Sequence, residues 1–264
     1  MKYFGFLAKF VIIPLAALGF FAWFDAKRGK KLPDKLGALP PAAIVAAHVG
    51  LAVAYTTPWD NYLVKTRVWW YDKKLVTGLV LGYVPIEEYT FFVLQTALTG
   101  MLLLTMARYT PSDEAPPKAG WRYRVGLTLG LGAVWVWSVY NLITRRQKLT
   151  YLSLTLAWGL LPLMFQTAFG GDILVQHRKL VALGIVLPTL YLGLSDSLAI
   201  DSGTWSINPE KTVDLHIGGK LPLEEGVFFL LTNVLISVGM TLMLSQESPK
   251  RIPPKLRQWL RIQA

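Results

Sequence analysis

The chain has 264 residues, of which 53% are hydrophobic and only 16% are charged, and it has no cysteine. The formal net charge of +11 could suggest nucleic acid, but the basic residues lie in short loops and in the C-terminal tail, a distribution that membrane orientation and anionic headgroups favour. The composition therefore predicts a membrane protein, and it excludes nucleic-acid binding, disulfide bonds and cysteine-ligated metals.

Several apolar runs reach the ~20 residues that a helix needs to cross ~30 Å of hydrocarbon. The first run is too long for the apolar region of a signal peptide, and Trp23, Phe24 and Asp25 at its end form no small-residue cleavage site. We therefore predict an all-α polytopic membrane bundle of about seven transmembrane helices, at residues 3–24, 40–57, 85–107, 124–144, 151–169, 180–195 and 222–244.

Residues 75–106 form an apolar run that is too long for one upright helix. As a single helix it would measure ~48 Å, and proline is tolerated in the first helical turn but not deep inside. We therefore expect the third helix to begin at Pro85, with residues 75–84 as a re-entrant or interfacial lead-in. Residues 215–221, which include Gly218 and Gly219, form a shorter lead-in before Pro222.

Two segments of the chain carry the same pattern. Asp60 is followed nine residues later by Trp69, and Asp196 is followed nine residues later by Trp205. Each Trp precedes a proline, two adjacent glutamates and two adjacent phenylalanines, at Pro85, Glu87, Glu88, Phe91 and Phe92 in one segment and at Pro222, Glu224, Glu225, Phe228 and Phe229 in the other. Adjacent carboxylates at a membrane boundary are costly unless the protein uses them, so the duplication predicts a site between two related halves.

The repeat also predicts the domain organisation. We expect a first repeat at residues 1–110, a connector with the fourth helix at 111–149, a second repeat at 150–245 and a basic tail at 246–264. Because helices one to three correspond to helices five to seven, the shift of four spans gives both halves the same orientation. Both acidic pairs should then face one membrane surface and share a long, mostly apolar cavity that opens sideways to lipid.

The duplicated acids have two interpretations. Glutamates at the third and fourth positions of a helix could simply complement its dipole, and an aspartate could simply end a helix. Alternatively, burial and like charges keep one carboxyl neutral, so that it donates a proton while an ionised neighbour stabilises a positive centre. Because the arrangement occurs twice, we favour the second interpretation. The candidate catalytic residues are Glu87, Glu88, Glu224, Glu225, Asp60 and Asp196.

Aromatic residues surround both acidic motifs. Trp and Tyr gather at membrane interfaces in any case, but ring faces also attract cations, at ~0.5–2 kcal/mol each. The candidates for cation stabilisation or substrate binding are Trp59, Trp69, Trp70, Tyr89, Phe92, Trp205 and Phe229. We predict no metal site, because His48, His177 and His216 are scattered. We also predict no nucleotide cofactor, because the sequence has no GxGxxG or GxxxxGK[ST] motif.

The first motif resembles the lycopene cyclase domain family, an integral-membrane type that occurs as two small subunits or one fused chain and is unrelated to the flavin-binding cyclases. The residues that carry the resemblance are Pro58-Trp59-Asp60-Asn61-Tyr62-Leu63-Val64, Trp69-Trp70-Tyr71, Gly82-Tyr83-Val84-Pro85-Ile86-Glu87-Glu88-Tyr89, Phe91-Phe92 and Gln95. The second half repeats the pattern at Asp196, Gly203-Thr204-Trp205 and Leu221-Pro222-Leu223-Glu224-Glu225. The second half differs from the first at Asp201, because the corresponding residue of the first half is Lys65. This difference leaves open whether both acidic pairs are catalytic.

The resemblance implies a substrate and a reaction. The substrate would be lycopene or a related polyene carotenoid held in the bilayer, and the partners would be membrane lipid and other enzymes of carotenoid biosynthesis. Protonation of a terminal double bond would give a carbocation that closes a ring, with β-rings as the favoured product and no cofactor. Two alternatives stay open: a carotenoid end-group hydratase that traps the same cation with water, and a small tandem-repeat membrane transporter.

The distribution of Lys and Arg predicts an orientation. The first, third and fifth loops and the C-terminal tail together hold more basic residues than the N-terminus and the even-numbered loops. The positive-inside rule then places the N-terminus outside a cell (inner) membrane and the C-terminus in the cytoplasm.

Overall fold

A computed structural model describes residues 1–110 and 117–260, so residues 111–116 of the predicted connector and 261–264 of the predicted tail lie outside the described residues. Within the described ranges, seven helices are long and apolar enough to cross a membrane, which confirms the predicted all-α bundle. Short helices flank them at Asp34–Leu36 (η2), Gln147–Leu149 (η3), Ser248–Arg251 (α9) and Pro254–Leu260 (α10). The long helices are Tyr3–Lys27, built from α1 (Tyr3–Leu7), η1 (Ala8–Ile12) and α2 (Ile13–Lys27), then α3 (Pro41–Lys65), α4 (Ile86–Tyr109), α5 (Gly120–Ile143), α6 (Thr150–Gln176), α7 (Arg178–Asp201) and α8 (Leu223–Leu244).

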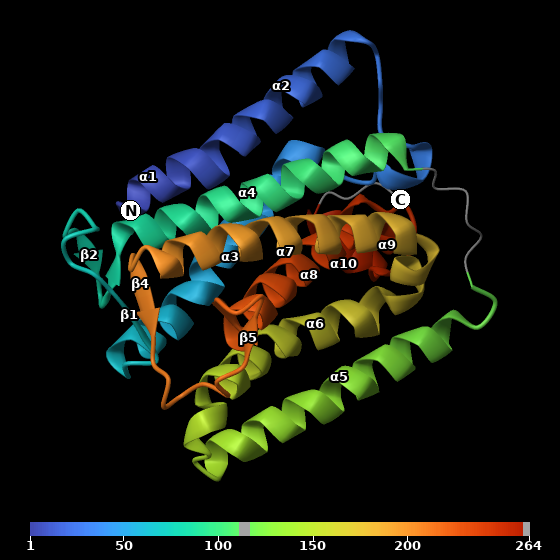
Figure 1. Ribbon diagram of the computed structural model, residues 1–264. Helices are drawn as coiled ribbons and strands as arrows, with labels where there is room; N and C mark the ends of the chain where they lie inside the picture. Colours follow the sequence, from blue (N-terminus) through green and yellow to red (C-terminus); the bar gives the residue numbers. More distant parts are fainter. Residues whose placement is uncertain (111–116, 261–264) are drawn as a thin grey trace.

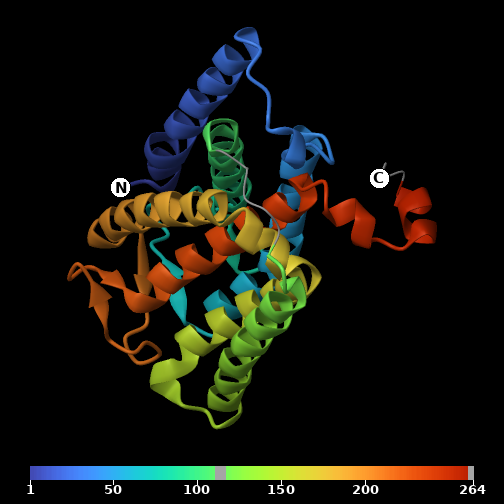
Figure 2. The ribbon, with the colours of Figure 1, turned by 90° about the vertical axis from the view of Figure 1, so that its right-hand side faces the viewer.

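The third helix of each half lies at the centre of the bundle. In the most apolar stretch of α4 61% of the residues are buried, and in that of α8 72% are buried, against 11% in α5. Figures 1 and 2 show α5 along the outside next to α6, while α2 leans away from the other helices at its far end. The outer helices present large apolar side chains on their exposed faces, as expected for surfaces that meet lipid.

Both predicted lead-ins are small β-hairpins. In the first, β2 (Val80–Leu81) pairs with β3 (Val84–Pro85), and in the second, β5 (His216–Ile217) pairs with β6 (Leu221–Pro222). Gly82 has φ 70°, a conformation that favours glycine, and a Cβ there would lie 2.1 Å from Oδ1 of Asn61. The turn therefore needs a glycine, which allows Asn61 to accept a hydrogen bond from the backbone N–H of Tyr83 at 2.7 Å.

A third strand pair joins the two halves of the chain. Strand β1 (Trp69–Tyr71) follows α3 and runs antiparallel to β4 (Trp205–Ile207), which follows α7. Trp69 lies opposite Ile207, and Tyr71 lies opposite Trp205. Figure 1 shows this pair at the end of the bundle where the N-terminus lies, with the C-terminal helices α9 and α10 at the other end. The pairing fixes the ends of α3 and α7 beside the starts of α4 and α8.

Three helices extend further than the sequence indicated. The predicted ends at residues 57 and 195 were wrong, because α3 continues to Lys65 and α7 to Asp201. In these extra turns Asp60 and Asp196 are buried, whereas the end residues Lys65 and Asp201 are exposed. Helix α6 also continues past its predicted end, although Gly170 departs from helical geometry with φ −146° and ψ 28°. Asp60 and Asp196 therefore lie within helices and project into the bundle.

Candidate active site

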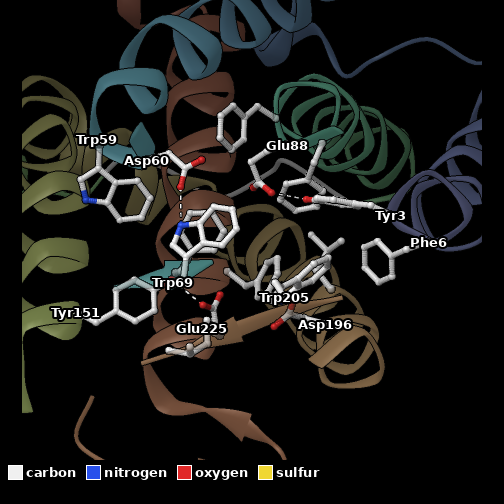
Figure 3. A pocket seen from close by; sticks show the side chains of 16 residues that line it. Tyr3, Phe6, Trp59, Asp60, Trp69, Glu88, Tyr151, Asp196, Trp205 and Glu225 are labelled. Atoms are coloured by element: carbon white, nitrogen blue, oxygen red, sulfur yellow. Dashed lines mark hydrogen bonds between the residues drawn. The ribbon is translucent and has the colours of Figure 1, made fainter. Parts of the chain in front are cut away.

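A cavity of about 40 Å³ lies at the end of the bundle where α3 and α7 end and α4 and α8 begin. Figure 3 shows that its side chains come from both halves of the chain and point toward one another. The lining, as far as the structure describes it, contains no Lys, Arg or His. The lining residues are Tyr3, Phe6, Trp59, Asp60, Trp69, Glu88, Phe91, Phe92, Tyr151, Leu192, Asp196, Trp205, Ile207, Glu225, Phe228 and Phe229.

Four of the six candidate acids meet in this cavity, two from each repeat. Glu88 is in the first turn of α4 and Glu225 in the first turn of α8, while Asp60 and Asp196 come from the last turns of α3 and α7. Asp60 is 3% exposed, Asp196 2% and Glu225 7%, and Glu88 is partly exposed. Because no cation lines the cavity as described and burial disfavours charge, four ionised carboxylates could not coexist there. The site is built to hold protons as well as negative charge.

Each cavity glutamate accepts a hydrogen bond from a tyrosine at the start of its own repeat. The hydroxyl of Tyr3 donates to Oε2 of Glu88, and the hydroxyl of Tyr151 donates to Oε1 of Glu225 at 2.6 Å (Figure 3). These partners are 85 and 74 residues apart in the chain, so the contacts depend on the packing of the bundle.

Each cavity aspartate has a tryptophan neighbour. The indole Nε1 of Trp69 donates to Oδ1 of Asp60 at 2.8 Å, and Trp205 and Asp196 line the same cavity in the second half of the chain. The other oxygen of each aspartate, Oδ2, is buried and has no hydrogen-bond partner in the described structure. A buried polar atom without a partner is costly, and it is a natural place for a proton or a ligand.

The outer glutamates, Glu87 and Glu224, lie outside the cavity. Glu87 Oε1 accepts a hydrogen bond from the backbone N–H of Thr77 at 2.6 Å, and Glu224 Oε1 accepts one from Val213 at 2.7 Å. Burial and the nearby Glu87 carboxylate raise the pKa of Tyr71 on β1. In each repeat, therefore, one glutamate of the pair faces the cavity and the other anchors the loop that precedes the helix.

Five of the seven candidate aromatic residues line the cavity, namely Trp59, Trp69, Phe92, Trp205 and Phe229. The other two, Trp70 and Tyr89, are not among its lining residues. Trp70 is the middle residue of β1, and successive side chains of a strand point to opposite faces. The hydroxyl of Tyr89 donates to the backbone oxygen of Leu81 at 2.8 Å and so holds the β2–β3 hairpin.

Sequence reasoning missed both tyrosines of the site. Tyr3 and Tyr151 were not selected because the first helices of the two repeats share little else in sequence. A signal was present: each tyrosine stands at the start of the first helix of its repeat. Phe6, Leu192 and Ile207 were missed as ordinary apolar residues, and Phe91 and Phe228 were noted only as parts of the repeated Phe-Phe pairs.

Both halves of the chain are similar to proteins of one family. A model of the lycopene cyclase family matches residues 9–107 and 147–243, one segment in each repeat. A lycopene beta-cyclase of Halobacterium salinarum is 35% identical over 245 residues, which cover 91% of this chain and 95% of that protein.

Longer fungal proteins match over part of their length. A bifunctional lycopene cyclase/phytoene synthase of Leptosphaeria maculans is 37% identical over 206 residues, 74% of this chain and 35% of that protein. One of the same name from Pyrenophora tritici-repentis is 37% identical over 201 residues, 72% of this chain and 34% of that protein. No solved structure matches the chain. The family model matches a segment in each half of the chain, and both halves build the cavity. The chain therefore belongs to the lycopene cyclase family.

Proposed function

We propose that this protein is a lycopene cyclase that converts the acyclic ends of lycopene into β-rings by acid catalysis. The observation that carries the proposal is the cavity itself, where two repeats bring four buried or half-buried carboxyls together within a wall of aromatic rings. Membership of the family and the 35% identity to a lycopene beta-cyclase support the choice of substrate and ring.

The reaction needs one proton to be given and one to be taken back. A neutral carboxyl transfers its proton to the terminal double bond, which forms a C–H bond and leaves a tertiary carbocation. The neighbouring double bond attacks that carbon and closes a six-membered ring, which moves the positive charge to a ring carbon. A carboxylate then removes a proton from the adjacent carbon, and the electron pair of that C–H bond forms the ring double bond. The product is an isomer of the substrate, and no electrons enter or leave.

The four cavity carboxyls share these tasks. A neutral member donates the proton, and an ionised member stabilises the cation and accepts the proton at the end. The rings of Trp59, Phe228 and their neighbours surround the reacting end and stabilise positive charge through their faces. They also exclude water, which would otherwise trap the cation as an alcohol.

The experiment that tests the function is expression in cells that accumulate lycopene, followed by chromatography and mass measurement of the extracted pigments. The expected product has β-rings and the mass of lycopene. Pigments heavier by one water per modified end would show a hydratase instead. Unchanged lycopene in cells that contain the protein in their membranes would contradict both.

The tyrosine contacts predict a moderate loss of rate. Tyr3→Phe and Tyr151→Phe each remove a hydroxyl that donates to a cavity glutamate while keeping the aromatic ring. Hydrogen bonds to charged groups contribute ~1.5–3 kcal/mol, so we expect ring formation to slow by about tenfold or more. The measurement is the rate of conversion in membranes with matched protein content. Tyr191→Phe is the control, because that hydroxyl donates to the backbone oxygen of Phe10 and lies outside the cavity. Parent rates in both site variants would rule out this role for the hydroxyls.

The proposed orientation is directly testable because the natural chain has no cysteine. We propose that the N-terminus faces outward in the cell membrane and the C-terminus faces the cytoplasm, as the basic residues favour. The exposed residues Lys73, between β1 and β2, and Lys255, on α10, lie toward opposite ends of the bundle. In intact cells, Lys73→Cys should react with a membrane-impermeant thiol reagent, and Lys255→Cys should react only after lysis. The reverse pattern would invert the orientation.

A further inference from the structure

A second cavity adjoins the acid-lined cavity deeper in the bundle. Phe92 and Phe228 belong to the walls of both cavities, so the two meet at this pair of rings. The second cavity has a volume of about 230 Å³ and is lined by residues of α3, α4, α6 and α8. Its lining is mostly apolar, with Gln95 and Thr232 hydrogen-bonded to each other at 2.9 Å. This space takes no part in the acid chemistry described above.

A third cavity follows the second. His48, Leu51 and Gln166 line both, and the third extends to Leu39 and to Ile252, beyond the end of α8. At 1.5 Å per residue, the twelve residues from Asp60 to His48 cover ~18 Å along α3, and the third cavity lies further on. The three cavities thus follow one line along most of α3, a length comparable to the ~30 Å of hydrocarbon in a bilayer.

The second and third cavities reach the lipid-facing surface between α3 and α6. Leu51 on α3 lines both cavities and is 63% exposed, and Phe165 on α6 lines the third and is 70% exposed. Closer to the acids, the hydroxyl of Tyr55 donates to the backbone oxygen of Trp158 at 2.9 Å and bridges these two helices. This contact covers the side of the bundle near the acids, while the second and third cavities are accessible from the membrane.

Gly239 on α8 makes room where the second and third cavities meet. A Cβ at this position would lie 2.5 Å from Nε2 of His48 and 2.8 Å from Nε2 of Gln166. Without a Cβ, these two side chains lie close to α8. Any larger residue at 239 would have to displace them, and both line the passage between the cavities.

We infer that the second and third cavities are the binding site for the polyene chain beyond its reacting end, which lies along α3 between α3, α6 and α8. This inference rests on the proposed function and adds the part of the protein that recognises the length of the substrate. An apolar, linear ligand fits adjoining, mostly apolar cavities that follow α3 and open to lipid, and a compact polar solute does not. Only one end of the molecule then reaches the acids at a time.

The test is to fill the channel at a point remote from the acids. Ala52→Trp places a large ring in the second cavity, and Ala54→Trp on the exposed face of the same helix is the matched control. Each variant is given lycopene and a shortened acyclic polyene that has the same end group but ends before Ala52. We expect Ala52→Trp to convert lycopene about tenfold more slowly or worse and to convert the short polyene at the parent rate. Ala54→Trp should convert both substrates like the parent.

Gly239→Val is an independent test from another helix. This variant should also slow the conversion of lycopene and leave the conversion of the short polyene unchanged, because the valine side chain pushes His48 and Gln166 into the passage. The assignment is overturned if Ala52→Trp converts lycopene as fast as Ala54→Trp does. It is also overturned if Ala52→Trp and Gly239→Val slow the conversion of lycopene and of the short polyene by the same factor. Binding of lycopene to purified protein, followed by its induced circular dichroism, separates this inference from the reaction. If the parent forms no rings, the proposed function fails. Weaker binding of lycopene by Ala52→Trp than by Ala54→Trp would then still support the channel, and equal binding would contradict it.

Discussion

Glu88→Gln and Glu225→Gln should each reduce ring formation by at least about a hundredfold, because general acid–base catalysis contributes ~10²–10⁴ in rate. The amide keeps the shape of the side chain but neither gives nor takes a proton at neutral pH. The loss should appear in the rate of conversion of lycopene in membranes, at equal protein content. It should exceed the loss in the tyrosine variants, which leave the carboxyl in place.

Glu87→Gln is the matched control for Glu88→Gln. The amide oxygen of Gln can still accept the hydrogen bond from the backbone N–H of Thr77, while the N–H₂ group replaces Oε2, which is buried without a partner but lies outside the cavity. We therefore expect a lower stability of the protein but most of the activity per folded molecule to remain. The same holds for Glu224→Gln, whose oxygen would still accept from Val213. If the outer variants lost as much activity as the inner ones, the chemistry would have to be assigned to the loop-facing carboxyls. If none of the four lost activity, the cavity would not be the active site.

Asp60→Asn and Asp196→Asn should have effects of similar size, for a different reason. Each of these aspartates lines the cavity and has a buried oxygen without a hydrogen-bond partner in the described structure, so an amide there leaves an N–H₂ group without an acceptor and removes a proton carrier from the cavity. We expect losses of about a hundredfold or more in conversion, with the protein still present in membranes.

The comparison of the two aspartates also tests the symmetry of the site. Equal losses would mean that both half-sites take part in each turnover. If one variant loses activity and the other keeps the parent rate, the repeats have divided their tasks, as the difference between Lys65 and Asp201 already suggests for their surroundings. Parent rates in both variants would contradict any role for these carboxyls in the reaction. Asp201→Asn is a suitable control, since that residue forms an exposed salt bridge with Lys220 at 2.8 Å.

The repeat predicted which segments would meet, but not which side chains would face the cavity. The same Pro-x-Glu-Glu pattern begins α4 and α8, so equivalent placement of Glu88 and Glu225 followed from the even number of intervening spans. Adjacent residues of a helix point ~100° apart, and the rotation of the helix is set by its packing partners. The sequence therefore did not distinguish Glu87 from Glu88.

Contacts between segments far apart in the chain could not be predicted from the sequence either. The tyrosines that bind the cavity glutamates come from helices whose sequences show little sign of the repeat, and only the folded bundle brings them there. The lead-ins were recognised as separate from their helices because of proline and glycine. Their hairpin form depends on local turn geometry, such as the positive φ of Gly82, and on side chains such as Asn61 that close over it.

The pairing of β1 with β4 has a consequence for how such a protein could have arisen. The strands belong to different repeats and pair antiparallel beside the cavity, to which each repeat contributes a glutamate, a tyrosine, an aspartate and a tryptophan. Related halves with the same orientation are what gene fusion of a two-fold symmetric dimer would leave behind, with its axis along the membrane normal through the site. Neither ancestral copy would have held a complete set of acids. In a single chain the two halves need not find each other, and each half of the cavity can change without the other.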